Sequence, residues 1–206
     1  MTARQNSARL FVLAAPSGAG KTTLVHRLTE RNPDLRFSVS YTTRQKRRNE
    51  THGRDYFFVT VTDFHDLEKR GELLESALVF DNYYGTGRTQ VEKHLAAGHD
   101  VILEIDWQGA RQVREAMPEC VSVFILPPSR DELERRLRNR RTDSDAVIER
   151  RLRDALSDMA HWVEFDFCIV NDDLERAVAE LEDVLAGGGE TCRRAAMADR
   201  IKNILV

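Results

Sequence analysis

The sequence predicts an α/β protein with a parallel sheet core flanked by helices. Short apolar runs alternate with longer segments of helical periodicity along most of the 206 residues, which is the pattern of strands joined by helical crossovers. Two segments interrupt this alternation and predict insertions into the core. The chain is long enough to bury a sizeable core, and 41% of its residues are hydrophobic.

Apolar runs and helical patterns follow one another in order. The buried strands are expected in "RLFVLAA" (9–15), "DVILEID" (100–106), "VSVFIL" (121–126) and "FDFCIV" (165–170). The clearest helices are expected in "KTTLVHRLTER" (21–31), with Leu24, Val25 and Leu28 on one face, and in "LERAVAELEDVLA" (174–186). Continuous apolar strands separated by helices favour a parallel sheet with right-handed crossovers.

Residues 37–90 and 130–154 form the two insertions. The first is rich in Thr, Tyr, Phe and Gly, and its alternating "RDYFFVTV" (54–61) predicts a small, half-exposed antiparallel sheet. The second carries nine arginines in a helical pattern, which "RRTDSD" (140–145) interrupts with a turn and a helix start. We therefore expect one domain with a core of 8–36, 91–129 and 155–206, a small mixed α+β insert at 37–90 and a helical lid at 130–154.

The tail follows the one clear linker, "AGGGE" (186–190). Its sequence, "TCRRAAMADRIKNILV" (191–206), has a modest amphipathic pattern. The pattern does not decide between packing on its own core and packing on a neighbouring copy in a homo-oligomer.

Charge and composition exclude several classes of protein. A formal net charge of −3 argues against a generally basic nucleic-acid binder. The apolar run "LFVLAA" (10–15) leads into Gly-Lys-Thr, which a secretory signal would discard, and no run approaches the roughly 18 residues of a membrane span. Three widely spaced cysteines and six scattered histidines favour reduced thiols and packing residues over a disulfide framework or a zinc site. We expect a cytoplasmic protein that binds neither nucleic acid nor membrane.

The run "LAAPSGAGKTTL" (13–24) predicts a phosphate-binding loop. Its glycines let successive backbone N–H groups turn toward an anion, and the helix that starts near Lys21 adds its positive end. Lys21 can reach the β- and γ-phosphates, and the Thr22 hydroxyl can bind Mg²⁺. Ala15 stands where the pattern has glycine, so its backbone must keep a negative φ. The alternative is a plain glycine turn.

A second anion pocket is indicated by arginines and tyrosines of the first insertion. Arg44, Arg47 and Arg48 lie within five residues, and arginine presents planar, forked donors that suit phosphate. Tyr56 and Tyr84 can add neutral donors. The residues alone leave open a solvated basic loop with tyrosines packed in a small core.

The chain resembles the guanylate kinases, and the bacterial type in particular, over nearly its whole length. The blocks that carry the resemblance are "APSGAGKTT", "SVSYTTR", "HGRDYFFV", "NYYGT", "DWQGA", "FILPPS", "RLRNR" and "IVNDD". The resemblance implies a P-loop core with a GMP-binding insert and a mobile lid. It also implies the Mg²⁺-dependent phosphorylation of GMP or dGMP by ATP, giving ADP and GDP, in purine nucleotide metabolism.

The resemblance also implies which residues bind each substrate. The GMP site would comprise Ser40, Arg44, Arg47, Tyr56 and Tyr84 around the phosphate, Glu75 and Thr86 at the guanine, Gly85 between Tyr84 and Thr86, and Glu104 and Asp106 at the end of a strand. The ATP site would comprise Ser17, Gly18, Ala19, Gly20, Lys21, Thr22, Thr23, Arg136 and Asn171. The transferring phosphoryl group would meet Lys21, Arg44, Arg140 and Arg151.

Each of these assignments has a simpler structural alternative. A carboxylate that accepts from guanine N1–H and N2–H₂ would discriminate against adenine; the alternative is that Glu75 is only a helix-end charge. The 104/106 spacing places both carboxylates on one strand face, toward the phosphate loop, where they can contact the acceptor nucleotide or hold Mg²⁺ through water. The lid arginines could be surface residues paired with Glu132, Glu134 and Glu149, as we expect for Arg135 and Arg150.

The chain departs from the family pattern at a few positions. Glu104 replaces an aspartate, which leaves its detailed role open. Lys46 replaces a proline and Asn49 a glycine; asparagine tolerates the left-handed conformation, so we expect Asn49 to keep the turn. The lid lacks the glycines that the family has near residues 139 and 141, which predicts a stiffer lid.

Phosphoryl transfer requires alignment, charge neutralisation and exclusion of water, and it needs no general base. We therefore expect two anion-binding cradles that face one another across a closing cleft. Two other functions remain as alternatives: a guanylate-kinase-like scaffold domain that binds peptides, and a kinase of similar fold that acts on a ribose bisphosphate. Lys21, Arg44 and Arg47 argue against the scaffold, and Glu75 with Thr86 favours guanine over the sugar.

Overall fold

The computed structural model of the chain describes residues 8–79, 81–139 and 145–205. These residues fall into two compact units. The first unit holds the described residues of 1–12, 33–103 and 108–121, and the second holds 13–32, 104–107 and the described residues of 122–206.

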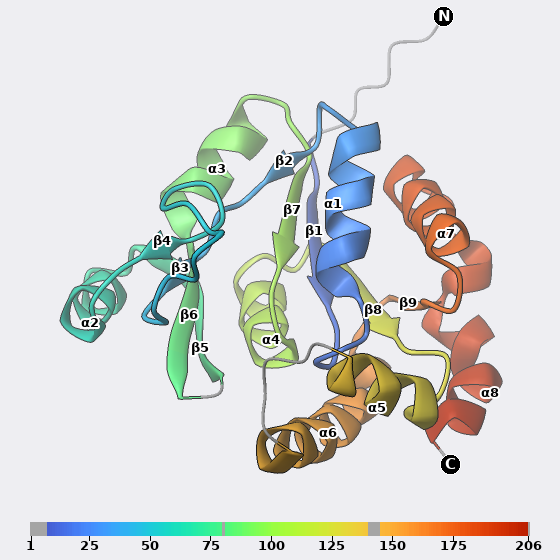
Figure 1. Cartoon of the computed structure of the whole chain (residues 1–206). Coiled ribbons are helices and arrows are strands. Elements are labelled where there is room, and N and C mark those ends of the chain that lie inside the picture. Colours follow the sequence, from blue (N-terminus) through green and yellow to red (C-terminus); the bar gives the residue numbers. More distant parts are fainter. Residues whose placement is uncertain (1–7, 80, 140–144, 206) are drawn as a thin grey trace, which may run out of the picture. The chain divides into compact units, whose positions relative to one another are not determined.

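Five strands form a parallel sheet whose chain segments are divided between the units (Figure 1). Their order is β2 (Arg36–Phe37), β7 (Val101–Glu104), β1 (Leu10–Ala14), β8 (Val121–Leu126) and β9 (Phe167–Val170). All five residues of β1 are buried, as are the last five of β8 and all four of β9. The buried strands predicted from apolar runs are confirmed, and β1, β7 and β9 are shorter than the runs that predicted them.

The first unit contains the pair β2–β7 and a second, four-stranded sheet. Arg36 and Phe37 lie opposite Val101 and Ile102 in the β2–β7 pair. The second sheet has the order β4 (Phe57–Phe58), β3 (Tyr41–Thr42), β6 (Asn82–Gly87) and β5 (Leu73–Val79). The helices of this part of the chain are α2 (Val61–Lys69), α3 (Arg88–Ala96) and α4 (Trp107–Ala116).

The small sheet is antiparallel in two of its three strand pairs, as predicted, and parallel in the third, so it is mixed. β5 and β6 form an antiparallel hairpin, but β3 pairs with β4 in parallel. The alternating segment 54–61 supplies only the two residues of β4. Only its last residue, Val61, lies in α2, because Thr60 accepts a hydrogen bond from the Asp63 N–H at 3.1 Å and Asp63 completes a capping box there. This local cap ends the strand-like alternation at Thr60.

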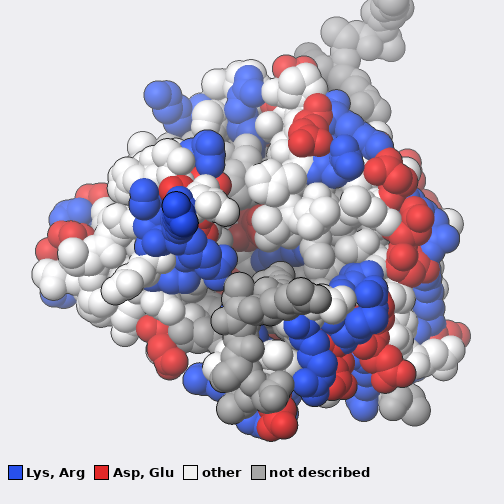
Figure 2. Space-filling view, in the orientation of Figure 1, with Lys and Arg blue, Asp and Glu red and all other residues white. Residues whose placement is uncertain are grey.

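In the second unit, α1 (Lys21–Arg31) and α7 (Leu174–Ala186) lie side by side (Figure 1). α1 buries Leu24, Val25 and Leu28, the face that its periodicity predicts. Ion pairs of Arg27 and Arg31 with Glu175 join the outer surfaces of the two helices. Acidic and basic side chains interleave on the right-hand side of the face in view in Figure 2.

The arginine-rich insertion contributes α5 (Arg130–Arg138) and the start of α6 (Asp145–Met159), and these two helices contact each other. Ser129 caps α5 by accepting from the Glu132 N–H at 3.1 Å, and Leu133 and Leu137 are buried beneath it. The predicted turn lies mostly at residues 140–144, outside the described residues, and the predicted helix start is confirmed at Asp145.

The tail packs on its own chain. After the short helices η1 (Ala160–Glu164) and η2 (Glu190–Cys192), α8 (Arg194–Leu205) contacts β9 and both of these elements. It buries Met197, Ile201 and Ile204. Of the two arrangements that the amphipathic pattern allowed, the structure shows the intramolecular one. No helix within the described ranges is long and apolar enough to cross a bilayer.

Candidate active site

The phosphate loop joins β1 to α1 in the second unit, at the carboxyl end of the strand. Gly20 is the N-cap of α1 in a left-handed conformation with φ 91°, and it provides no side-chain cap. The first turn of α1 carries no acidic residue, so its N–H groups and the positive end of the helix suit an anion. Ala15 is not among the described residues with positive φ, which confirms that alanine is tolerated there.

Lys21 and Thr22 are hydrogen-bonded to the end of β7: to Ile105, which follows the strand, and to Glu104, its last residue. The Lys21 ammonium donates to the carbonyl of Ile105, and the Thr22 hydroxyl donates to Glu104 Oε1 at 2.5 Å. Glu104 is thus the acidic residue at the loop, as its place at the end of the strand predicts. Asp106 lies beyond the strand end, where its charge adds to burial in raising the pKa of Asp158.

Arg136 and Asn171 bind the phosphate loop from the side of α5 and the end of β9. The Asn171 amide donates to the Ala19 carbonyl at 2.8 Å, and Arg136 Nη1 donates to the same oxygen at 3.2 Å. Arg136 Nη2 also donates to the carbonyl of Asn171 at 2.9 Å. Arg136 and Asn171, both predicted at the ATP site, therefore lie together, and both donate hydrogen bonds to the backbone of the loop.

Glu132 orients Arg136 within this group. Its carboxylate accepts from Arg136 Nε at 2.7 Å and from Arg135 Nε at 2.6 Å. Hydrogen bonds from Arg135 and Arg136 lower the pKa of Glu132 to about 2. The predicted surface pairing of Arg135 is confirmed.

The other lid arginines have different surroundings. Arg150 is exposed and lies 3.9 Å from Asp154, so it is a paired surface arginine, as predicted. Arg151 lies in α6 and is partly buried. Arg140, predicted to contact the transferring phosphoryl group, lies outside the described residues.

A cluster of arginine and aromatic side chains forms at the small sheet of the first unit. The Arg44 guanidinium lies 5.4 Å from the centre of the Tyr56 ring, and the rings of Tyr56 and Tyr84 are 5.9 Å apart, edge to face. Burial lowers the pKa of Arg44, but hydrogen bonds with Glu50 and Tyr84 outweigh it and the net shift is upward. Three of the residues predicted around the acceptor phosphate are therefore neighbours.

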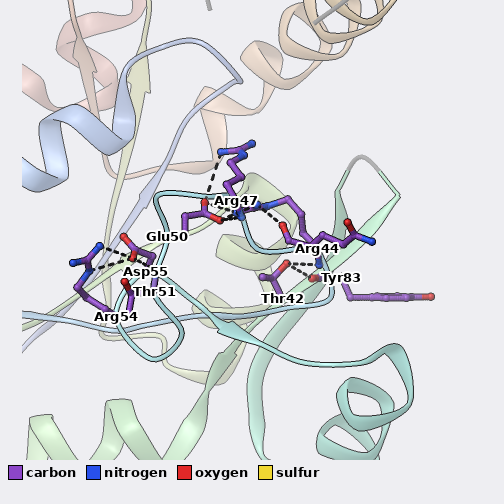
Figure 3. A network of polar contacts seen from close by, with 9 residues as sticks. Thr42, Arg44, Arg47, Glu50, Thr51, Arg54, Asp55 and Tyr83 are labelled. Atoms are coloured by element: carbon purple, nitrogen blue, oxygen red, sulfur yellow. Dashed lines mark hydrogen bonds and ion pairs between the residues drawn. The ribbon is translucent and has the colours of Figure 1, made fainter. Parts of the chain in front are cut away.

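Arg47 joins this cluster through Glu50, a residue that the sequence reasoning missed. Glu50 accepts from both terminal nitrogens of Arg44 and from the backbone N–H of Arg47 (Figure 3). The hydrogen bond from Arg44 is the main reason that the pKa of Glu50 is lowered. The sequence did contain a signal for it, because a glutamate directly follows the arginine-rich "RQKRRN" (44–49) and can pair with one of these arginines.

Asn49 keeps the turn of this loop, as expected, but not through a left-handed backbone. Asp81 is the only non-glycine residue with positive φ in the described ranges. The turn is closed instead by the bond from the Glu50 N–H to the Arg47 carbonyl at 3.1 Å. Asn49 therefore needs no glycine-like backbone.

Glu75 and Thr86 form a buried polar pair on the β5–β6 hairpin. They lie opposite each other in register, and the Thr86 hydroxyl donates to Glu75 Oε1 at 2.6 Å. Only 4% of Glu75 and 0% of Thr86 are exposed. A carboxylate this deeply buried needs hydrogen-bond partners, and a helix-end charge is excluded because Glu75 lies within a strand.

Ser40 directly precedes β3, and Gly85 lies in β6 next to Thr86. Ser40 is buried, and its carbonyl accepts from the Phe57 N–H at 2.9 Å. A Cβ at Gly85 would lie 3.0 Å from the Glu75 carbonyl oxygen and from the Phe64 ring. Gly85 therefore has a packing role that the structure shows, apart from the nucleotide contact that the sequence predicts.

The strand–loop–helix unit with Lys21 and Thr22, together with Glu104 from the neighbouring strand, defines a P-loop nucleotide-binding protein. A family model described as guanylate kinase matches residues 7–187. The chain belongs to the guanylate kinase family. This family consists of nucleoside monophosphate kinases, which are phosphotransferases.

Several named proteins are similar to this chain. The guanylate kinase of Methylococcus capsulatus is 54% identical over 187 residues, which cover 91% of this chain and 92% of the relative. That of Escherichia coli K12 is 49% identical over 178 residues, or 85% and 86% of the two chains. The crystal structure of guanylate kinase from Anaplasma phagocytophilum superposes with a TM-score of 0.75 at 34% identity and covers 97% of this chain and 96% of that one.

Proposed function

We propose that this chain transfers the γ-phosphoryl group of ATP to GMP or dGMP and releases ADP and GDP. Its membership of the guanylate kinase family supports the reaction class. The observation that carries the choice of acceptor is the buried Glu75 carboxylate bonded to Thr86. Guanine presents two adjacent N–H donors to such a carboxylate, whereas adenine would leave the carboxylate unpaired.

On the ATP side, the proposal assigns the phosphates to the loop 17–23. Backbone N–H groups at the start of α1 would bind the phosphate oxygens, and Lys21 would exchange its bond to the Ile105 carbonyl for the β- and γ-phosphates. Arg136 and Asn171 hold the Ala19 carbonyl, so in this proposal they keep the N–H groups of the loop turned toward the anion. Arg140 and Arg151 are proposed to contact the transferring group.

Magnesium is part of the proposal, and the residues present fit it. The Thr22 hydroxyl and the Glu104 carboxylate, 2.5 Å apart, are the hard oxygen donors that Mg²⁺ prefers. Across residues 8–79, 81–139 and 145–205, no three His, Cys, Asp or Glu side chains group closely enough to hold a metal by themselves. Thr22 and Glu104 would therefore hold the ion together with ATP phosphates, and the ion would supply neutralisation of the phosphate charge.

On the acceptor side, the proposal assigns the GMP phosphate to Ser40, Arg44, Arg47, Tyr56 and Tyr84. Hydrogen bonds with Glu50 and Tyr84 raise the pKa of Arg44 above its ordinary value. The guanidinium therefore stays charged at every pH at which the protein is folded. Glu75 and Thr86 would bind the guanine, with Gly85 beside them, and Asp106 is proposed to approach the acceptor nucleotide. The phosphate oxygen of GMP is already ionised at neutral pH, so the reaction requires orientation and no general base.

A coupled assay with several acceptors tests the choice of substrate. ADP formation from ATP and Mg²⁺ is measured with GMP, dGMP, AMP and ribose 1,5-bisphosphate. We expect kcat/KM for GMP to exceed that for AMP by about 10⁴-fold, because a site built to pair with a donor pattern rejects the analogue that lacks it. A larger kcat/KM with AMP or with the sugar bisphosphate would overturn the proposal.

The variant Lys21→Ala separates catalysis from binding in the same assay. We expect kcat to fall by about 10³-fold or more, because the charge on the transferring phosphoryl group loses its ammonium partner. Calorimetric titration should show nearly unchanged GMP binding, because Lys21 belongs to the ATP side. Substantial turnover in this variant, or no turnover in the unaltered protein, would contradict the assigned role.

The proposal places the reaction in the cytoplasm, where soluble nucleotides are available.

A further inference from the structure

Glu50 holds together the loop between β3 and β4. Arg44 donates from Nη2 to Glu50 Oε1 at 2.7 Å and from Nη1 to Oε2 at 3.1 Å (Figure 3). The backbone N–H of Arg47 donates to the same Oε2 at 2.8 Å, and the Glu50 N–H donates to the Arg47 carbonyl at 3.1 Å. One carboxylate thus binds a guanidinium along one edge and closes a backbone turn.

The Arg44–Glu50 pair is far less exposed than the other ion pairs of this loop. The side chains of Arg44 and Glu50 are 15% and 14% exposed, whereas Arg47 is 66% exposed. The neighbouring Arg54–Asp55 pair is 69% and 30% exposed. A bidentate pair shielded from water is ordered and strong, while an exposed pair contributes little.

The rest of Arg44 is anchored to the small sheet. Its backbone N–H donates to the buried Thr42 hydroxyl at 3.2 Å, and Thr42 in turn donates to the Tyr83 carbonyl at 3.0 Å. Nη1 also donates to the carbonyl of Gln45 at 2.9 Å. The base of the side chain is therefore fixed by the strand, and Glu50 sets the direction of the guanidinium plane at its tip.

We infer that Glu50 is a positioning residue for the acceptor-phosphate site: it stays bound to Arg44 and orients the guanidinium toward the phosphate of the nucleoside monophosphate. This inference rests on the proposed function, in which Arg44 binds that phosphate. A guanidinium has five N–H donors on a rigid plane. Glu50 uses one N–H from each terminal nitrogen, so it fixes the plane without consuming every donor.

The alternative role is that of an internal competitor that the substrate phosphate displaces from Arg44. The bonds between Glu50 and the Arg47 backbone argue against displacement of the Glu50 carboxylate from Arg44. Leaving Arg44 would also take the carboxylate from the Arg47 N–H, which an incoming phosphate at the guanidinium does not replace. The negative charge of Glu50 near a phosphate costs some affinity, and the ordering of Arg44 compensates for it.

The two roles predict opposite changes in Glu50→Gln. The amide matches the carboxylate in size, but its NH₂ group faces a guanidinium donor and cannot accept from it. If Glu50 positions Arg44, KM for GMP should rise about tenfold or more while kcat changes less than about threefold, and KM for ATP should not change. A lower KM for GMP would identify a competitor, and an unchanged KM a surface residue; either result overturns the inference.

Binding of guanosine separates positioning from general damage to the loop. Glu50→Gln should weaken GMP binding in calorimetry and leave guanosine binding unchanged, because guanosine lacks the phosphate that Arg44 contacts. Equal loss of both ligands would overturn the inference in favour of a purely structural role. Glu50→Asp, which keeps the charge, should recover part of the affinity, and it provides the same test if the glutamine variant does not fold.

Asp55→Asn is the matched control. Asp55 also binds an arginine and a backbone N–H of the same loop, at Arg54 and Thr51, but its arginine is exposed and is not assigned to the substrate. We expect its KM for GMP to stay within about twofold of the unaltered protein. An effect as large as that of Glu50→Gln would overturn the inference. Failure of the unaltered protein to use GMP would instead overturn the proposed function.

Discussion

At the scale of single residues, the phosphate loop depends on one backbone conformation and one close approach. Gly20 has a φ of 91°, and a Cβ added there would lie 2.4 Å from the Asn171 Nδ2. That amide holds the Ala19 carbonyl. A side chain at position 20 would therefore both strain the backbone and push away the residue that orients the loop.

We expect Gly20→Ala to lower the free energy of unfolding by more than about 2 kcal/mol and to raise KM for ATP. Gly98→Ala is the matched control, because Gly98 has a φ of 83° but no atom within 4 Å of an added Cβ. Gly98→Ala should lower the free energy of unfolding only by the backbone strain, about 1–2 kcal/mol. It should leave KM for ATP unchanged. Urea unfolding and steady-state kinetics measure both quantities. Equal costs in the two variants would show that the Asn171 contact is unimportant.

At the scale of elements, α5 carries the arginine that binds the phosphate loop. Ser129 starts the helix, Leu133 and Leu137 fasten it to the core, and Glu132 then sets the direction of Arg136 toward the Ala19 carbonyl. The helix therefore acts as one unit: its leucines are buried, and Arg136 reaches the loop backbone.

The ionisation of Glu132 makes this unit sensitive to acid. Its pKa is about 2 in the folded protein and about 4.5 ordinarily. A lowered pKa stabilises the fold above the ordinary value, and this stabilisation is lost as pH falls from 4.5 toward 2. Glu132→Gln should therefore be less stable than the unaltered protein at pH 7, and the difference should shrink through that window. Urea unfolding of both proteins across this range measures it; a difference independent of pH would contradict the assignment.

At the scale of the whole molecule, the buried thiols report on the integrity of the core. Cys168 lies in β9 and is fully buried, and burial raises its pKa to about 12. Cys192, also buried, has its pKa raised mainly by burial. The thiolate is the reactive form, so Cys168 and Cys192 are inert thiols in the folded protein.

We expect Cys168 to react with a thiol reagent such as Ellman's reagent only through unfolding. At pH 8 and 25 °C, labelling of the Cys120→Ser, Cys192→Ser double variant should proceed at least about 10³-fold more slowly than in 6 M guanidinium chloride. Its rate should rise with denaturant in step with global unfolding. Rapid labelling of the native variant would show that the core around β9 opens locally.

Much of the fold could be predicted because it rests on local signals. Periodicity placed α1 and α7 at their observed residues, and continuous apolar runs identified the buried strands. The alternation of 54–61 predicted β4 but extended past its end, where a capping box at Thr60 starts a helix at Val61. A capping box is also local, and weighing it against the alternation would have corrected that prediction.

The candidate site also has a part that local sequence predicts and a part that depends on long-range contacts. The sequence by itself determined the phosphate loop, because Gly20, Lys21 and Thr22 are adjacent in the chain and the chemistry of the motif is carried by its own backbone. Only the tertiary structure decided that Glu104 meets Thr22, that Arg136 and Asn171 converge on Ala19, and that Glu75 meets Thr86. These partners lie between 11 and 152 residues apart. Contacts at such separations depend on strand order and packing, which no short pattern of residues encodes.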